Sequence, residues 1–332
     1  MDFDLTEDQR EIRGVAHELL ASRSPFARVR EAAEADAYDD PLWREIVALG
    51  WPGIAVGERH GGQGLGAVEL AVLLEELGYA CAATPLLSTA VAAAVIETGG
   101  SDAQRDRWLA GLIAGELSAG IGSGELVLDG HGADVVVLID DHDARLLESP
   151  LSEPVQTIDP TRRFARLAGA GAGDGEPLGA GAAGRIYGAI AAEVVGLCQR
   201  ALEMTLDYVK DRRQFGVPVG SFQAVSHRCA QMLLHTESAR STAYYAAWAA
   251  DADPERLDEA AALAAAAAAT AGREVAASAI QAHGGIGFTW EADVHWLYKR
   301  AEVDRALLGG VKRHHAALAR AAAARVATVA TR

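Results

Sequence analysis

One segment in the second half of the chain combines two fixed cations with an aromatic ring and a glycine turn. Residues 212–218 read Arg-Arg-Gln-Phe-Gly-Val-Pro and follow a stretch with helical periodicity. Guanidinium groups form charge-assisted hydrogen bonds with phosphate oxygens, so Arg212 together with Phe215 could hold a phosphate or a dinucleotide. The same residues also suit an ordinary helix end, because arginine near a helix C-terminus favours the helix dipole and glycine stops the helix.

A second segment, residues 281–288, reads Gln-Ala-His-Gly-Gly-Ile-Gly-Phe. Its closely spaced glycines let the backbone approach a ligand, and their exposed N–H groups can bind anionic oxygens. The segment is not a dinucleotide fingerprint, because it follows a helical stretch and not a strand. A plain helix end and turn is the alternative. A third glycine-rich stretch, residues 50–66, reads as a loop between helices.

The histidines and cysteines form no recognisable site. Three histidines lack the spacing of metal ligands and are interpreted as surface or core residues: His227, His235 and His283. His314 and His315 are adjacent on a predicted helix, so they point apart. The cysteines are odd in number and far apart, without a CxxC motif: Cys81, Cys198 and Cys229. We therefore predict no metal site, and free buried thiols in a reducing cytoplasm.

The elements that would position these segments are mostly helical in the first ~115 residues. Thr6 and Gln9 predict a capping box for a first helix, which Pro25 ends. Further helices are predicted over residues 41–49, 67–77, 89–97 and 102–114. Short β-rich runs separated by turn residues then predict a small antiparallel β segment: residues 126–128, 135–139, 145–147 and 155–158. Residues 168–184 are rich in glycine and alanine and read as a linker.

The last part of the chain is again helical. Apolar residues that step by three or four, from Ile186 to Tyr208, predict a first long helix. A second runs from about Gln223 to Ala250, a third from Pro254 to Gly284, and a fourth over residues 312–329. Four long helices with short breaks indicate an antiparallel bundle. The expected fold is thus mostly α, with an N-terminal helical domain (1–116), a shortened middle β-domain and linker (117–182) and a C-terminal four-helix bundle (183–332).

Bulk properties exclude several classes of protein. The chain has 332 residues, half of them apolar, which is enough for two or three domains with a large core. The formal net charge of -16 argues against nucleic-acid binding and against an anionic membrane surface. The first residues are charged, unlike a secretory signal, and no apolar run is long enough to span a membrane.

Together, in this order and spacing, the segments resemble the acyl-CoA dehydrogenase family over nearly the whole chain. Two motifs about 70 residues apart carry the resemblance: Arg212-x-x-Phe215-Gly216 with Gln223 downstream, and Gln281-x-x-Gly284-Gly285-x-Gly287-Phe288. Residues 49–51 and 61–66 are also similar to the N-terminal domain of the family. The joint occurrence of these pieces is far more specific than any one of them.

The resemblance implies a flavoprotein. Members of the family have an N-terminal helical domain, a middle β-domain and a C-terminal four-helix bundle, and are usually tetramers. FAD lies between the β-domain and the bundle, while a neighbouring subunit holds its pyrophosphate and adenosine side. By resemblance, three residues should contact the FAD of a partner subunit: Arg212, Phe215 and Gln223. Three more should line the same diphosphate region: Gln281, Gly284 and Gly285.

The family reaction is α,β-desaturation of an acyl-CoA thioester, in which a glutamate removes the α-proton. That glutamate occupies one of two positions in the family. Here the first is Leu308, followed by two glycines, and the second falls in residues 184–187, which contain no acid. Glu193 stands further along the same helix and is interpreted as an acid satisfied within the packing. A leucine cannot abstract a proton, so we predict no catalytic residue in this chain.

The β segment also departs from the family, whose middle domain is close to twice as long. Residues 118–166 lack its Ser/Thr-Glu and Gly-Ser-Asp stretch, and residues 120–124 (Gly-Ile-Gly-Ser-Gly) are too short to replace it. Short members with these losses, which this chain resembles also in residues 158–162, are the smaller partners in heteromeric acyl-CoA dehydrogenases of actinobacterial sterol and bulky acyl-CoA breakdown. The hypothesis is an α2β2 complex in which a larger subunit supplies the base and each heterodimer holds one FAD.

Two alternatives remain open from the sequence. The chain could be an active homo-oligomeric flavin enzyme with an unusual base, or a helical scaffold that has lost flavin. The retained arginine, glutamine and glycine set speaks against the second. The acyl group, the partner and the electron acceptor are not indicated by the sequence.

Overall fold

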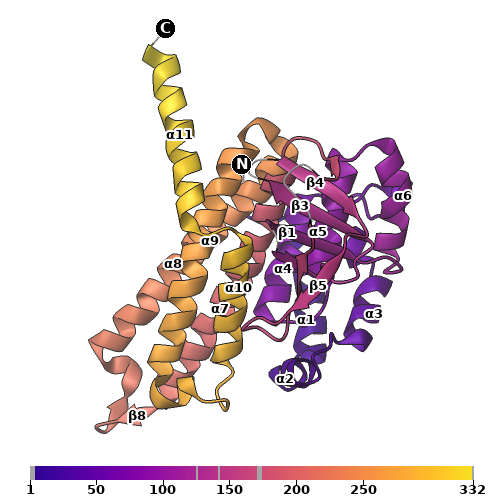
Figure 1. Cartoon of the computed structure of the whole chain (residues 1–332). Helices are drawn as coiled ribbons and strands as arrows, with labels where there is room; N and C mark the ends of the chain where they lie inside the picture. Colours follow the sequence, from indigo (N-terminus) through magenta and orange to yellow (C-terminus); the bar gives the residue numbers. More distant parts are fainter. Residues whose placement is uncertain (1–3, 125, 141–142, 170–173, 331–332) are drawn as a thin grey trace.

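The computed structural model describes residues 4–124, 126–140, 143–169 and 174–330, and three parts follow one another along the chain (Figure 1). The N-terminal part is helical: α1 (Glu7–Arg23), α2 (Phe26–Glu34), α3 (Asp40–Ala48), η1 (Trp51–Gly53), η2 (Glu58–His60), α4 (Ala67–Tyr79), α5 (Leu86–Gly99) and α6 (Asp102–Ile113). The middle part is a sheet: β1 (Ala119–Ser123), β2 (Leu126–Leu128), β3 (Val135–Asp140), β4 (Asp143–Glu148), β5 (Ser152–Val155), β6 (Phe164–Leu167) and β7 (Glu176–Pro177). The C-terminal part is a helical bundle: α7 (Ala182–Asp211), β8 (Arg213–Gln214), β9 (Val217–Pro218), η3 (Val219–Ser221), α8 (Gln223–Ala252), η4 (Pro254–Arg256), α9 (Leu257–His283), η5 (Gly284–Phe288), α10 (Val294–Leu307) and α11 (Val311–Ala330). The predicted fold class, mostly α with a small sheet between two helical parts, is confirmed.

The N-terminal helices begin and end where their sequence signals indicate, with two exceptions. The capping box of α1 is present, since Thr6 Oγ1 accepts from the Gln9 N–H at 3.2 Å and Gln9 Oε1 accepts from the Thr6 N–H at 2.9 Å. Pro25 ends α1, but it also occupies the N-cap position of α2, a helix that the sequence analysis missed. Proline suits a helix start because it has no N–H to satisfy there. Helix α5 starts at Leu86, three residues earlier than predicted.

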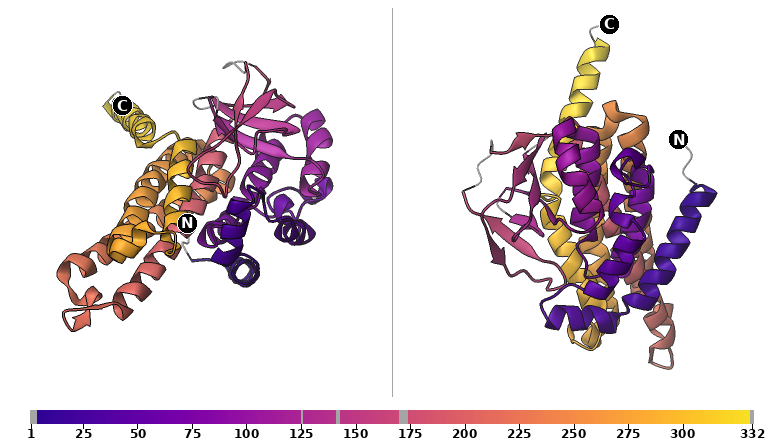
Figure 2. Two further views of the ribbon diagram at one scale, coloured as in Figure 1. Left: turned by 60° about the horizontal axis from the view of Figure 1, so that its bottom comes forward. Right: turned by 90° about the vertical axis from the view of Figure 1, so that its right-hand side faces the viewer.

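The seven strands form one sheet in the order β5-β6-β2-β1-β3-β4-β7, which covers one side of the helices (Figure 2). The expectation of a wholly antiparallel segment was wrong in one pairing, because β1 and β3 run parallel with Ala119 opposite Val135. Strand β2 pairs with one edge of β1, and the next strand, β3, pairs with the other edge. Strand β1 itself (Ala-Gly-Ile-Gly-Ser) was missed, since two glycines hide its β propensity. Part of the predicted linker, residues 170–173, lies outside the described residues.

The bundle contains a helix that the sequence analysis did not predict. Helix α10 packs against α9 and α7, and it is the fourth helix of the bundle. Its apolar face is interrupted by charged residues, so no clear stripe marks it. Helix α11, predicted as the fourth bundle helix, packs against α9 through its first turns and then projects from the body (Figures 1 and 2). His314 near its start is buried, whereas Val326 is 70% exposed.

The N-terminal part and the bundle touch backbone to backbone where α4 crosses α7. Gly78 and Gly196 lie at this crossing. A Cβ atom on Gly78 would lie 2.0 Å from the Glu193 carbonyl oxygen, and one on Gly196 would lie 1.8 Å from that of Glu75. These two helices therefore approach closely only because both positions lack a side chain.

Gly196→Ala is expected to destabilise the fold by about 2 kcal/mol, because the added methyl group forces the two helices apart in a well-packed core. The matched control is Gly14→Ala on α1, where an added Cβ has no atom within 4 Å. There alanine should stabilise by about 0.5–1 kcal/mol through its higher helix propensity. Chemical denaturation of both variants gives the comparison. Equal effects at the two sites would contradict a tight crossing.

Three further expectations can be compared with the described residues. Cys81, Cys198 and Cys229 are free and buried, as predicted. Within residues 4–124, 126–140, 143–169 and 174–330, no helix has the length and apolar character needed to cross a membrane. The same residues contain no cluster of histidine, cysteine and acidic side chains that could bind a metal.

Candidate cofactor-binding site

The two motifs found in the sequence lie at the same end of the bundle. Helix α7 runs down to the β8–β9 hairpin and α9 runs down to η5, at the lower end of the bundle in Figure 1. The ring of Tyr208 on the last turn of α7 stacks on that of His283 at the end of α9, with centroids 4.4 Å apart. His283 is thereby a buried core histidine, one of the two interpretations that the sequence left open.

The first motif forms a tight hairpin that presents its side chains to solvent. Arg212 caps the end of α7 and is exposed, and its carbonyl oxygen accepts from the Val219 N–H at 2.8 Å. Phe215 and Gly216 make the turn with positive φ angles of 53° and 84°. A left-handed conformation is unfavourable for a bulky residue such as phenylalanine. Phe215 is also 93% exposed, with only an edge contact to Phe222.

The second motif is an open glycine turn. Gln281 is exposed on the last turn of α9, and Gly284 ends the helix at φ 65° and ψ -140°, a conformation essentially restricted to glycine. Added Cβ atoms on Gly284 and Gly285 would have no atom within 4 Å. A ligand can therefore reach this backbone closely. Gly287, in contrast, is buried against the Ile280 carbonyl oxygen and has a packing role.

All six residues predicted to contact a cofactor are exposed: Arg212, Phe215, Gln223, Gln281, Gly284 and Gly285. Gln223 is the first residue of α8, directly after the hairpin. An accessible guanidinium and an open glycine turn fit a diphosphate. Large apolar side chains nearby are also exposed, with Phe288 at 76% and Trp290 at 69%. Such an apolar and cationic surface indicates that another chain or a cofactor covers this end.

The position where a base was sought is apolar in the structure. Leu308 caps α10 and is fully buried, and its carbonyl oxygen lies 2.6 Å from His314 Nε2. The ring of Tyr187 on α7 contacts His314 edge-on at 5.0 Å. A nearby cavity of about 360 Å³ includes Asp258, but this acid is exposed on the first turn of α9. Leu308 therefore contributes to packing and to no acid–base chemistry.

A buried cluster of charged residues was largely missed by the sequence analysis. It joins the loop after β5 to α7 and α10 through Asp159, Arg162, Glu193, Arg300 and Asp304, whose side chains are almost inaccessible. Arg300 donates from Nε to Asp159 Oδ2 at 2.6 Å and from Nη1 to Glu193 Oε1 at 3.1 Å. Arg162 also donates to Glu193. Glu193 is thus paired within the packing, as interpreted, and is not poised as a base.

Asp304 is the exception in this cluster. Both of its carboxyl oxygens are buried without a hydrogen-bond partner. Burial, followed by the nearby Glu193 carboxylate, raises the pKa of Asp304 well above its ordinary value. The charge balance of the cluster is consistent with this raised pKa, because the carboxylates of Asp159 and Glu193 already balance the guanidinium groups of Arg162 and Arg300. Burial and the charge balance of the cluster therefore both favour the protonated form of Asp304 in the folded chain.

Asp304→Asn is expected to reduce the pH dependence of stability. The folded chain keeps a proton that the unfolded chain releases above the ordinary pKa of 3.8. The stability that this proton contributes is complete below that pH and is lost as the pH rises toward the raised pKa. Asparagine does not titrate. As the pH rises through this window, the free energy of unfolding of the variant should therefore increase relative to the wild type by up to about 1.4 kcal/mol per pH unit. Urea denaturation from acidic to neutral pH tests this prediction, with the exposed Asp102→Asn as control. A difference in stability between Asp304→Asn and the wild type that did not change with pH would contradict it.

A helical part, a sheet and a helical bundle follow one another in this order, with an exposed arginine and an open glycine turn at one end of the bundle. Residues 6–116 match the family profile described as the acyl-CoA dehydrogenase N-terminal domain, and residues 183–323 match that of the C-terminal domain. The chain therefore belongs to the acyl-CoA dehydrogenase family.

Individual proteins similar to this chain indicate which members of the family it resembles. The chain is 36% identical over 313 residues to "Acyl-CoA dehydrogenase IpdE2" of Mycobacterium tuberculosis, an alignment that covers 91% of this chain and 93% of the relative. Among solved structures, "Tcur3481-Tcur3483 steroid ACAD G363A variant" has a TM-score of 0.86 at 27% identity and covers 97% and 99% of the two chains. The ChsE4-ChsE5 complex from M. tuberculosis has the same TM-score and coverage at 25% identity. The resemblance inferred from the sequence is confirmed.

Proposed function

We propose that this chain is the smaller subunit of a heteromeric acyl-CoA dehydrogenase. In this proposal it binds the diphosphate and adenosine side of FAD, and a larger partner subunit supplies the base and the pocket for the flavin ring. One observation carries the proposal: the six cofactor-binding candidates are exposed together at the end of the bundle, while the position of the base is a buried leucine. Such a site is complete only with a second chain.

Two solved complexes support a partner subunit. Both similar structures are named for two components, Tcur3481-Tcur3483 and ChsE4-ChsE5, and the first is called a steroid ACAD. By analogy the complex here is an α2β2 heterotetramer with one FAD per heterodimer. A bulky acyl-CoA thioester of steroid breakdown is the proposed substrate class.

The roles of this chain's own residues follow from their chemistry. The Arg212 guanidinium would pair with phosphate oxygens, and the backbone at Gly284 and Gly285 would come close to the same diphosphate. Phe215, Gln223 and Gln281 would complete the contact. FAD, when bound, supplies the hydride acceptor for α,β-desaturation of the thioester. No residue of this chain is assigned to proton removal.

The test is the absorbance spectrum of the protein purified alone and after co-expression with a larger dehydrogenase subunit. The proposal predicts a colourless or weakly coloured chain alone and a yellow complex with one flavin per two chains. An active homo-oligomer would instead be yellow alone and would bleach with an acyl-CoA. A scaffold without flavin would stay colourless with every partner. Either result would overturn the proposal.

Leu308→Glu is expected not to create activity in the chain alone. A glutamate placed at this buried position would restore the residue type of the family, but not the missing part of the flavin ring pocket. Leu308→Gln, with the same size and no charge, controls for effects on folding. Desaturation of an acyl-CoA is followed by formation of the enoyl product. Steady turnover by the glutamate variant alone would mean that the pocket is complete.

A further inference from the structure

A cavity of about 710 Å³ lies where one end of the sheet meets the N-terminal helices and α10. Its walls come from the segment between α2 and α3, from the start of α5, from the loop that joins β5 to β6, and from Trp290 and Lys299. The six cofactor-binding candidates are not among its lining residues. The proposed function therefore leaves this cavity without a role.

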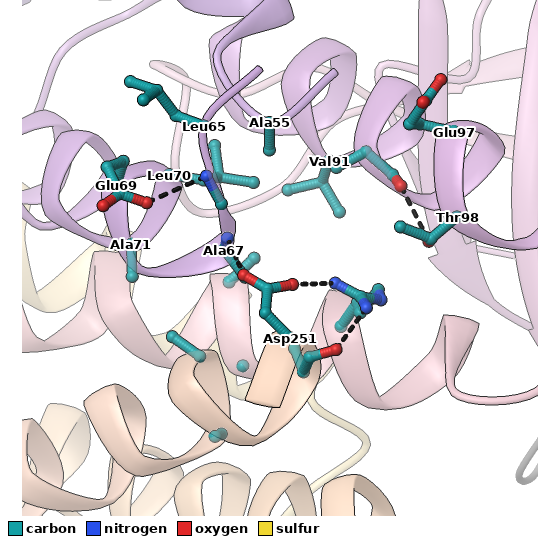
Figure 3. A pocket seen from close by; sticks show the side chains of 18 of the residues that line it. Ala55, Leu65, Ala67, Glu69, Leu70, Ala71, Val91, Glu97, Thr98 and Asp251 are labelled. Atoms are coloured by element: carbon teal, nitrogen blue, oxygen red, sulfur yellow. Dashed lines mark hydrogen bonds and ion pairs between the residues drawn. The ribbon is translucent and has the colours of Figure 1, made fainter. Parts of the chain in front are cut away.

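The cavity is also separate from both positions of the family's base. Lys299 lies in the first half of α10 and Leu308 follows the last residue of this helix, so the two are about 13 Å apart along its axis. A second cavity, of about 460 Å³ between α4, α5, α7 and α8, includes Gly184 and Arg185 of the other base position (Figure 3). The two cavities share no lining residue.

Much of the wall is apolar and conformationally restricted. Three prolines with fixed φ angles contribute to it: Pro85, Pro154 and Pro160. Two large apolar side chains of the wall are left exposed to solvent, Ile158 at 55% and Trp290 at 69%. The volume falls in the range of ligand pockets, about 300–1,000 Å³. The cavity is therefore preformed, and a ligand that enters it buries apolar surface.

Lys299 brings an ammonium group to this cavity. Its Nζ lies 4.1 Å from the ring centroid of Trp290 and 4.7 Å from that of Trp296. Within the part of the chain that the structure describes, no carboxylate lies within ion-pair distance of it. Burial lowers the pKa of Lys299 from its ordinary value. Such a partly dehydrated ammonium gains from pairing with an anion.

Two arginines of the loop before β6 add further donors. Arg162 is buried, and its Nε has no hydrogen-bond partner among the described residues. Arg163 is exposed, donates to the Asp36 carbonyl oxygen and lies over the Tyr38 ring, with its Cζ 5.2 Å from the centroid. In the described chain no carboxylate pairs with Arg163. Cationic side chains with unused donors therefore line the cavity.

The acidic side chains of the wall already have donors or are open to solvent. Asp129 accepts from the hydroxyl groups of Tyr38 and Ser88, and burial raises its pKa. Asp159 accepts from Arg300 Nε at 2.6 Å. The other three acids are partly or fully exposed: Asp36, Glu116 and Asp134. The inner wall thus offers unused donors and few free acceptors, which favours an anionic ligand.

We propose that this cavity binds a ring compound that carries one carboxylate. The carboxylate pairs with the Lys299 ammonium, and the ring lies against the apolar wall that includes Ile158. The site is built from residues of this chain and does not depend on FAD binding at the end of the bundle.

Naphthalene-2-carboxylate and naphthalene-2-carboxamide test the ligand class, because they share one ring system and nearly one shape but differ in charge. Calorimetric titration of the full chain gives both affinities. The carboxylate is expected to bind at least about tenfold more tightly, since only the carboxylate forms a charge-assisted pair. Lys299→Met keeps the apolar stem and removes the charge. It should abolish this preference, while carboxamide binding stays within about twofold of wild type.

The matched control is Lys312→Met, the same change at an exposed lysine on α11 outside the cavity, which should leave both affinities unchanged. Ile158→Trp narrows the cavity from an exposed position and should weaken both probes, whereas Leu151→Trp, at an exposed leucine outside the cavity, should weaken neither. Equal affinity of the two probes for the wild type would overturn the ligand class. A preference that persists in Lys299→Met, undiminished binding in Ile158→Trp, or no binding of the carboxylate to the wild type would overturn the site.

Discussion

Arg300→Met is expected to lower the free energy of unfolding by about 3–5 kcal/mol, the effect of removing one partner from a buried ion pair. Arg300 is fully buried on α10, where it donates to Asp159 in the sheet loop and to Glu193 on α7. Methionine replaces much of its volume but none of its donors. Asp159 would then lose its cation and Glu193 one of its two, in a region shielded from solvent, which is the physical source of the loss.

The control is Arg23→Met, which removes a surface ion pair with Glu45 whose side chains are 54% and 40% exposed. Exposed pairs contribute about 0–1 kcal/mol, so this variant should stay close to wild type. Urea denaturation followed by helical circular dichroism measures both. If Arg300→Met changed stability no more than Arg23→Met, the buried cluster would not be what joins sheet and bundle.

In the complex with the larger subunit, Arg212→Ala is expected to weaken FAD binding roughly 10- to 150-fold. This range corresponds to about 1.5–3 kcal/mol for a hydrogen bond to a charged group. Arg212 is exposed at the end of α7 and can turn its guanidinium toward a diphosphate without breaking a contact in the core. Titration of the apo complex with FAD gives the affinity, and gel filtration shows whether the complex remains assembled.

Arg213→Ala is the matched control for this prediction, because it removes the same charge one residue further on. Arg213 lies on β8, and its side chain donates from Nη1 to the Gly216 carbonyl oxygen over a long distance of 3.5 Å. A general loss of positive charge would weaken FAD equally in both variants. A specific role for Arg212 requires that its loss be clearly larger, and unchanged affinity would remove Arg212 from the site.

The sequence predicted those features that depend on local chemistry. The capping box at Thr6, the end of α9 before Gly284 and the turn at Gly216 each follow from residues close together in the chain. The two cofactor motifs were also recognisable locally, and the structure brings their helix ends together through Tyr208 and His283. Whether these residues touch FAD stays a prediction.

What the sequence did not predict depends on distant contacts. Helix α10 was missed because Arg300 and Asp304 interrupt its apolar face, yet both are buried against the loop after β5. Strand β1 was missed because its two glycines lower its β propensity, although the structure requires them where Val127 of the neighbouring strand comes close. Arg300 and Asp304 are four positions apart and so lie on one face of a helix, and this pairing was the signal that could have indicated the buried cluster.

The contact between α4 and α7 at Gly78 and Gly196 also has a consequence for ligand selection. With no side chains between the two backbones, the helices cannot slide or separate without losing their packing. The cavity of about 460 Å³ in Figure 3 has walls on both of these helices, so its width depends on how closely they pack. A cavity whose width is set by this helix packing would select ligands by size and shape. It would accept ligands that match its width and exclude wider ones.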